Sequence, residues 1–171
     1  MRRTLGRARH AGKPCLSHTS GMDMQAATLP WPVAEPHCIR VTVGAEDIDA
    51  FEHTNNVSYL RWLEQCAWSH TCALGLDMDA YRRIGTGCVA RRHELDYLAA
   101  SFEGDELIVG TWIEENDGRV TMWRGYRIFR AADAREVLRA RTQWACVDMA
   151  SGRPKRQPPE FVAAYAAATS T

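Results

Sequence analysis

The stretch "DAFEHTNNVSYLRW", residues 49–62, gathers a carboxylate, an imidazole and two amides just before an apolar pattern begins. Asp49 can act as a general base toward water or as a nucleophile toward a carbonyl carbon. The free backbone N–H groups of a first helical turn can stabilise negative charge that develops on an oxygen. His53 precedes that turn, where it can bond a carbonyl oxygen, orient water or hold Asp49. We therefore predict Asp49, His53, Asn55 and Asn56 as catalytic residues, although the histidine can also be a structural donor and the two asparagines can serve to cap the helix.

A long helix is expected to position these groups. Its apolar residues recur near helical spacing, at Val57, Leu60, Leu63, Ala67 and Leu74. Either Thr54 or Asn55 can cap its start, and Gly75 is a natural C-terminal stop. The pattern predicts a mostly buried helix from about Asn56 to Leu74, nearly 30 Å long at about 1.5 Å per residue.

Strand patterns lie on both sides of this helix. Ile39, Val41 and Val43 alternate with polar residues before it. Four further strand-like runs follow it, at residues 87–98, 106–115, 119–130 and 135–149, and Asn116–Gly118 is a strong hairpin signal. This order predicts an α+β domain in which a curved antiparallel sheet of about five strands wraps around one long central helix. The four later strands are expected to form a meander.

Composition limits the domain organisation and the function classes. The 171 residues suit one ordered domain, predicted over 37–160, with a flexible extension at 1–36 and a short C-terminal helix or tail at 161–171. The net charge of zero argues against a general nucleic-acid binder. No apolar run approaches the roughly 20 residues that span a membrane.

The six cysteines show neither a CxxC pair nor a zinc-type His/Cys spacing. We therefore predict no metal site and no cofactor. Because the N-terminal segment also lacks the apolar region of a secretory signal peptide, we expect reduced thiols and a cytoplasmic location.

Three stretches carry a family resemblance. "DIDAFEHTNNVSYLRWLE" resembles the DxDxxGHxNNxxYxxxxE signature of hot-dog-fold acyl-CoA thioesterases, the group of 4-hydroxybenzoyl-CoA thioesterases and their relatives. "FEGDELIV" and "VDMASGRPKRQP" look like two further segments of that family, so the likeness spans roughly residues 38–159. The resemblance implies the hot-dog fold, hydrolysis of an acyl-CoA substrate to a free acid and coenzyme A, and a homodimer or homotetramer with the acyl site between subunits. It puts Asp49 at the catalytic carboxylate and matches His53, Asn55, Asn56 and Tyr59 to the motif.

Two positions depart from the family pattern. Glu52 replaces the glycine that would ease a tight turn, and its carboxylate either joins the site or points outward. Phe51 stands where the related plant acyl-carrier-protein thioesterases carry a catalytic asparagine. Two alternatives therefore remain beside acyl-CoA hydrolysis: a carrier-protein thioesterase, and a non-catalytic acyl-CoA-binding module.

Substrate contacts are expected on two kinds of side chain. Tyr59 and Trp62 are predicted as pocket-wall aromatics, although both also suit the core. Coenzyme A brings phosphates, which arginine side chains bind well, and any one of the basic residues can equally be a solvated strand residue. The candidates for the phosphates are Arg91, Arg92 and Arg153, and also Arg124, Arg127, Lys155 and Arg156. The acyl group can be aromatic or aliphatic.

Overall fold

A computed structural model describes residues 24–169 of the protein. Within these residues the chain forms a short helix, one strand, a 3-10 turn, two helices, four strands and a last short helix. In chain order they are α1 Met24–Ala27, β1 His37–Thr42, η1 Ala45–Asp47, α2 Asn56–Ala73, α3 Met78–Ile84, β2 Thr86–Tyr97, β3 Glu106–Asn116, β4 Thr121–Arg130, β5 Glu136–Asp148 and α4 Pro159–Ala164. The long helix thus matches its predicted span to within one residue.

The strands form one five-stranded antiparallel sheet in the order β1-β3-β4-β5-β2. The strands β3, β4 and β5 are a meander, as predicted, but β2 pairs with β5 and not with β3, so the predicted four-stranded meander is wrong at its first strand. Residues 98–105 carry the chain from one side of the sheet to the other. Backbone hydrogen bonds from Leu98 to Val137 and from Val43 to Asp105 hold the two ends of this crossing. The edge strands of the sheet are therefore β1 and β2.

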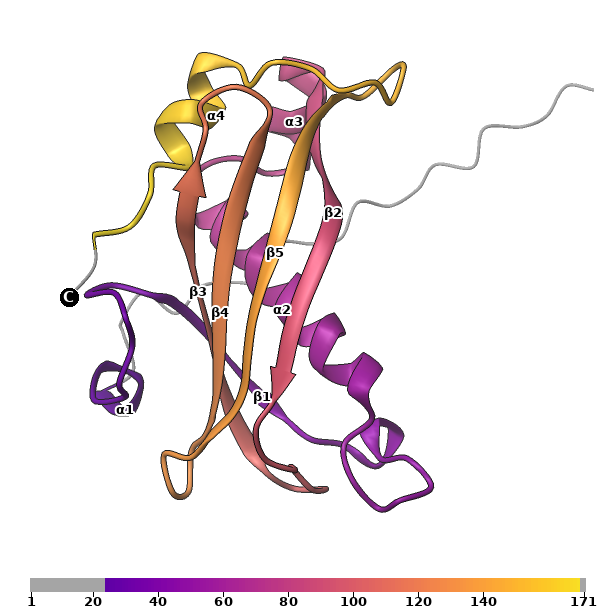
Figure 1. The fold of residues 1–171 in the computed structure, drawn as a ribbon, viewed down its shortest axis with the longest axis vertical. Coiled ribbons are helices and arrows are strands. Elements are labelled where there is room, and N and C mark those ends of the chain that lie inside the picture. The colour runs from indigo at the N-terminus through magenta and orange to yellow at the C-terminus, as the bar shows by residue number, and fades with distance from the viewer. Residues whose placement is uncertain (1–23, 170–171) are drawn as a thin grey trace, which may run out of the picture.

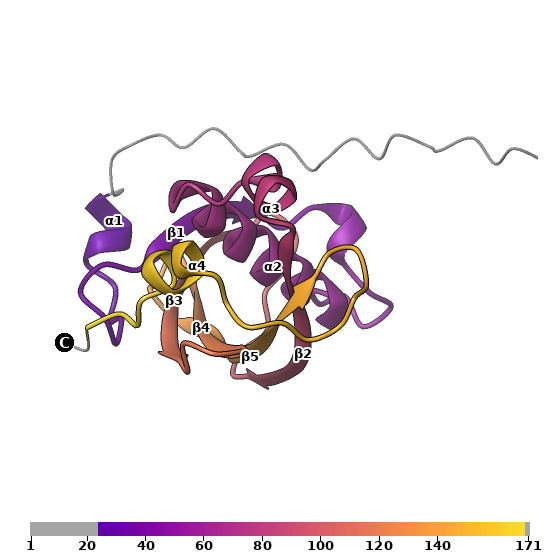
Figure 2. The ribbon, with the colours of Figure 1, turned by 90° about the horizontal axis from the view of Figure 1, so that it is seen from above.

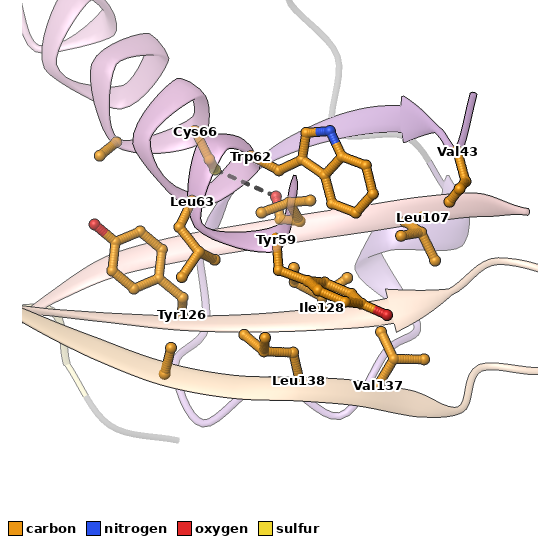
Figure 3. Packing of buried hydrophobic residues seen from close by; sticks show 13 residues of the cluster. Val43, Tyr59, Trp62, Leu63, Cys66, Leu107, Tyr126, Ile128, Val137 and Leu138 are labelled. Carbon is orange, nitrogen blue, oxygen red and sulfur yellow. Dashed lines mark hydrogen bonds between the residues drawn. The ribbon is translucent and has the colours of Figure 1, made fainter. Parts of the chain in front are cut away.

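Helix α2 lies in the concave face of the sheet, which curves around it (Figures 1 and 2). This is the predicted hot-dog architecture. The helix directs Tyr59, Trp62, Leu63 and Cys66 at inward-facing strand residues such as Ile128 (Figure 3). Burying a leucine as fully as Leu63 makes its replacement by alanine cost about 2–5 kcal/mol. The sheet and the helix are therefore held as one body, which fixes where the start of α2 lies.

Residues 24–36 pack onto the convex face of the sheet, although the sequence predicted an ordered domain only from residue 37. Ala26 and Leu29 are buried against Ile108 and Phe129, which point away from α2 because side chains alternate along a strand. Trp31 lies over Gly110, where a β-carbon would come within 2.4 Å of its ring. The remaining part of the predicted extension, residues 1–23, lies outside the described residues.

Helix α3 was not predicted. Asp77 caps its start by accepting a hydrogen bond from the Ala80 N–H at 2.8 Å, and Gly85 ends it in a left-handed conformation, φ 69°. Its Tyr81 packs beside Phe161 and Tyr165 of the C-terminal segment, with Phe161 at a ring-centroid distance of 5.1 Å. Residues that follow the expected domain end at 160 thus belong to its core.

Candidate functional site

Asp49 lies in a tight loop that leads into α2. The Asp49 N–H donates to the His53 carbonyl at 2.9 Å, and the Glu52 N–H donates to the Asp49 carbonyl at 3.0 Å. The Asp49 Oδ1 accepts the Phe51 N–H at 2.8 Å, which fixes the half-buried carboxylate against its own turn. Among the described residues, Oδ2 has no hydrogen-bond partner. The carboxylate is thereby held in place with one oxygen available to an external group.

Glu52 adopts φ 62°, the left-handed conformation that glycine would take without strain. The turn of the family motif is therefore retained with a non-glycine residue. The Glu52 side chain is exposed, so of the two outcomes considered for its carboxylate the structure has it pointing outward.

The start of α2 supplies backbone donors next to this loop. Asn55 is the N-cap, and its Oδ1 accepts the Val57 N–H at 2.8 Å. The Ser58 N–H donates to the Asn55 carbonyl at 2.9 Å. Among the described residues the Asn56 N–H has no acceptor, and it lies at the positive end of an 18-residue helix. It is the backbone donor that remains for an external oxygen.

The other residues predicted from the motif occupy different surroundings. His53 is exposed and sets the edge of its ring against Phe102, with centroids 5.3 Å apart. Its backbone, and not its ring, contacts Asp49. Tyr59 and Trp62 are both 3% exposed and belong to the core, and the Tyr59 hydroxyl hydrogen-bonds Ser101 Oγ at 2.8 Å.

The three arginines predicted for the coenzyme phosphates are all exposed. Arg91 stands at the irregularity of the β2–β5 pairing, and Arg92 forms an ion pair with Glu94 at 2.9 Å. Arg153 lies in the turn that follows β5. Arg124, a further candidate for that role, is instead 1% exposed, so it cannot border a solvent-facing opening.

Two adjoining cavities run between α2 and the sheet. The first, which we call the Arg124 cavity, has a volume of about 470 Å³; its lining includes Trp68, Thr71, Tyr81, Met122 and Arg124. The second, which we call the β2 cavity, has a volume of about 390 Å³; its lining includes Leu60, Val89, His93 and Thr142. Both are lined by Glu64, Cys88 and Trp144. These volumes are in the range of ligand-binding sites.

The polar groups of the Arg124 cavity form a connected network. The Tyr165 hydroxyl donates to Thr71 Oγ1 at 3.2 Å, so the Tyr81 hydroxyl must be the donor in its 2.7 Å bond to Tyr165. Burial raises the pKa of Tyr165 to about 12 and that of Cys88 to about 12, so both groups are neutral at pH 7. Among the groups that line the cavity and are buried, Arg124 is therefore the one that carries a charge.

Arg124 was predicted as a phosphate contact and not as part of a buried cavity, although one signal for a buried position was available. Arg124 shares with Met122 and Tyr126 the face of β4 that turns toward α2, and a charged residue that faces inward on a buried strand is unusual. Trp68 and Glu64 are one helical turn apart on the same side of α2. Tyr81 gave no such signal because α3 was not predicted.

Within one chain, the Asp49 loop lies at the start of α2, whereas the Arg124 cavity lies along its second half. Asp49 precedes α2, whereas Trp68 and Thr71 lie in its second half. At 1.5 Å per residue, the rise from Asn56 to Trp68 is about 18 Å. Asp49 lines neither of the two cavities. Within a single chain, the carboxylate and the larger cavity are therefore far apart.

Residues 24–169 contain no cluster of three or more His, Cys, Asp or Glu side chains suited to a metal ion. Among the described residues, Cys66, Cys88 and Cys146 are free thiols. In the described part of the chain every helix is too short or too polar to span a bilayer.

A curved antiparallel sheet around one long helix defines the hot-dog class of folds. The sequence model of the thioesterase-like superfamily matches residues 43–165. The chain belongs to this superfamily. No curated protein matches it.

Solved structures have the same fold at low sequence identity. The 1,4-dihydroxy-2-naphthoyl-CoA thioesterase from Synechocystis is 18% identical, with a TM-score of 0.68 over 77% of this chain and 96% of that one. The DHNA-CoA thioesterase from Staphylococcus aureus is 18% identical, with a TM-score of 0.69 over 76% and 88%. A Staphylococcus aureus protein solved in complex with CoA is 15% identical, with a TM-score of 0.70 over 76% and 81%.

Proposed function

We propose that the protein is an acyl-CoA thioesterase that hydrolyses the thioester to a free acid and coenzyme A. The observation that supports this most directly is the pairing of a fixed carboxylate, Asp49, with an N–H group of the first turn of α2 that has no acceptor among the described residues. The superfamily membership and the CoA-bound relative support the same reaction.

The chemistry needs an activated nucleophile and a donor for the developing oxyanion. The Asn56 N–H, at the positive end of α2, donates to the thioester carbonyl oxygen and stabilises its negative charge. Asp49 takes the proton of a water that attacks the carbonyl carbon, and the carboxylic acid then protonates the departing thiolate. In a second route, Asp49 attacks the carbon directly and the C–S bond breaks to release the coenzyme A thiolate; water then opens the mixed anhydride, and a proton from that water goes to the thiolate. Both routes give the same products.

We propose further that the active site is completed by a second copy of the chain. Tyr97, at one end of β2, hydrogen-bonds the Asn56 carbonyl at 3.3 Å and so lies beside the start of α2. Cys88, near the other end of β2, lines both cavities. Since β2 is an edge strand, two copies can pair their β2 strands antiparallel about a twofold axis. That arrangement brings the Asp49 loop of one subunit beside the Arg124 cavity of its partner.

Exposed apolar residues support this interface. Val57, on the first turn of α2, is 71% exposed, and Val89, on β2, is also exposed. The same surface carries one wall of the β2 cavity, which includes Leu60. Pairing would cover these side chains and supply acceptors and donors to an otherwise open strand edge. Light scattering at micromolar concentration should therefore give a dimer or tetramer mass, and a monomer mass would refute this assembly.

The enzymatic proposal is tested by measuring thiol release over a panel of acyl-CoA esters. Replacing Asp49 with Asn or Ala should lower kcat/KM about 10²–10⁴-fold, because the proton acceptor or nucleophile is lost. Asp133→Asn, in the exposed β4–β5 turn, is the matched control and should behave as wild type. Turnover that persists unchanged in both Asp49 variants would remove Asp49 from the mechanism. Release from carrier-protein thioesters alone would identify the alternative substrate class.

A further inference from the structure

Arg124 is a buried cation without a carboxylate partner. Its side chain is 1% exposed, and no acidic oxygen of the described residues lies within 4.0 Å of its guanidinium nitrogens. Desolvating a charge without pairing it is costly, so buried arginines are normally paired with an acid. This arginine lines the larger of the two cavities, whose other buried residues are mostly apolar.

The acceptors that Arg124 does have are neutral and few. Its Nη1 donates to His70 Nδ1 at 2.7 Å. Because Nδ1 accepts this bond, it carries no proton, and the imidazole supplies no negative charge to offset the guanidinium. Its Nη2 donates to Thr71 Oγ1 at 3.5 Å. A guanidinium has five N–H donors, so about three remain without an acceptor among the described residues. The Arg124 Cζ lies 5.9 Å from the centre of the Tyr165 ring, which offers a face and no lone pair.

A second donor of the same cavity also lacks an acceptor. The Trp68 Nε1 is buried and has no hydrogen-bond partner, while its ring packs edge-to-face on Tyr81 at 5.8 Å. Trp144 Nε1 has none at hydrogen-bond distance either. Unlike Trp68 Nε1, however, Trp144 Nε1 lies near the Tyr126 hydroxyl. Burial raises the pKa of Tyr126 to about 12, and Arg124 and the Trp144 indole oppose that rise. The cavity thus presents a positive charge and an indole N–H, and its tyrosine hydroxyls are already donating.

We propose that Arg124 and the Trp68 indole N–H bind a carboxylate at the far end of the acyl group, so that the preferred substrates are CoA thioesters of dicarboxylic acids. This inference rests on the proposed function, which puts the acyl group in the Arg124 cavity. A terminal carboxylate supplies two acceptor oxygens and the missing negative charge, while the methylene chain suits the apolar walls. Glu64 and Arg82 also line the cavity, and because both are exposed they lie on its solvent side.

The test compares two non-hydrolysable thioethers of equal length, S-hexyl-CoA and S-(5-carboxypentyl)-CoA, by titration calorimetry on the full chain. They differ only in the terminal group, so all phosphate contacts are the same. Wild type should bind the carboxylate analogue at least about 10-fold more tightly, since charged hydrogen bonds are the stronger kind and the donors are otherwise unpaired. Equal affinity for the two, or tighter binding of the hexyl analogue, would overturn the proposal.

Variants assign the preference to its residues. Arg124→Met should abolish the preference and leave hexyl binding within about threefold of wild type, whereas Arg124→Lys should retain part of it. Trp68→Phe keeps the ring on Tyr81 and should reduce the preference severalfold. Arg135→Met removes an exposed cation and is the matched control for net charge. If Arg124→Met weakens both analogues equally, Arg124 does not recognise the terminal carboxylate and the proposal fails. A melting curve checks that each variant folds. If Arg124→Met does not fold, the Trp68→Phe variant still decides the test.

Hydrolysis assays separate this proposal from the thioesterase proposal. Turnover of hexanoyl-CoA and adipoyl-CoA with equal kcat/KM would leave the enzyme standing and overturn the carboxylate subsite. Preferential binding of the carboxylate analogue without turnover of any acyl-CoA would support the carboxylate subsite and overturn the thioesterase proposal. A wild-type protein that binds neither analogue would overturn both.

Discussion

If Asp49 of one subunit acts on an acyl group held in the cavity of its partner, two different inactive variants should restore activity together. Asp49→Asn removes the carboxylate. Met122→Trp fills the Arg124 cavity, because Met122 is 4% exposed and lines it. In a heterodimer of the two variants, one composite site carries both substitutions and the other carries neither.

The expected magnitude follows from this counting. Random reassociation of equal amounts gives about half heterodimers, each with one intact site of two, so the mixture should recover about a quarter of wild-type activity. A heterodimer isolated with two different affinity tags should show about half of it. We propose that two chains supply the two parts because Asn56 and Trp68 are separated by about 18 Å along α2. Thiol release from a single acyl-CoA is the assay.

Controls and a clear failure complete this experiment. A mixture of Asp49→Asn and Asp49→Ala should stay inactive, because every site then lacks the carboxylate. The Met122→Trp protein must show a cooperative melt, since overpacking a core costs about 1–3 kcal/mol. Heterodimers as inactive as either parent would refute the composite site and mean that Asp49 works with a cavity of its own chain.

Three further predictions concern stability. Glu52→Gly should raise the free energy of unfolding by about 1 kcal/mol, since a non-glycine residue at φ 62° is strained, and the melting temperature reports it. Gly110→Ala should lower that free energy by about 1–3 kcal/mol in denaturant titration, because the added methyl meets the Trp31 ring. Partial burial of Asp117 is outweighed by hydrogen bonds from residues 119–121, which hold its pKa below the ordinary value. Asp117→Asn should therefore destabilise the protein near neutral pH and matter progressively less as the pH falls from about 5 through the depressed pKa.

One exposed residue provides the matched controls. Glu103 has no hydrogen-bond partner among the described residues, and its φ is not positive. Glu103→Gly should give no gain in stability, and Glu103→Gln should leave the free energy of unfolding at neutral pH as in wild type. A Glu52→Gly protein that melts at or below the wild-type temperature would contradict the strain at that turn. Gly110→Ala with unchanged stability would mean that Trp31 moves aside at no cost.

The parts of the fold that local patterns determine were predictable from the sequence. Helical spacing from Val57, with a cap at Asn55 and a stop at Gly75, gave the limits of α2 because each signal acts within a few residues. The partner of β2 was not predictable in this way. Its pairing with β5 depends on how the whole sheet closes around α2, and alternation along one strand carries no record of its neighbour.

The candidate site likewise has a part that local sequence predicted and a part that depends on tertiary packing. Asp49, Asn55 and Asn56 lie close together in sequence, so one motif names them. Arg124 and Trp68 come to line the same cavity only after β4 has packed against α2. The inward-facing position of an arginine in an alternating strand is the sequence signal for this cavity.

The segment that carries Trp31 would restrict how the proposed dimers associate further. It covers the outer surface of β3 and β4 around Ile108 and Phe129, and Trp31 Nε1 donates to the Ala26 carbonyl at 2.7 Å. Two dimers that met back to back over this region would have to displace a packed indole and its hydrogen bond first. If the proposed dimers form a tetramer, they are thus expected to meet through the remaining surfaces, and removing residues 24–36 would test this without altering the two cavities beneath α2.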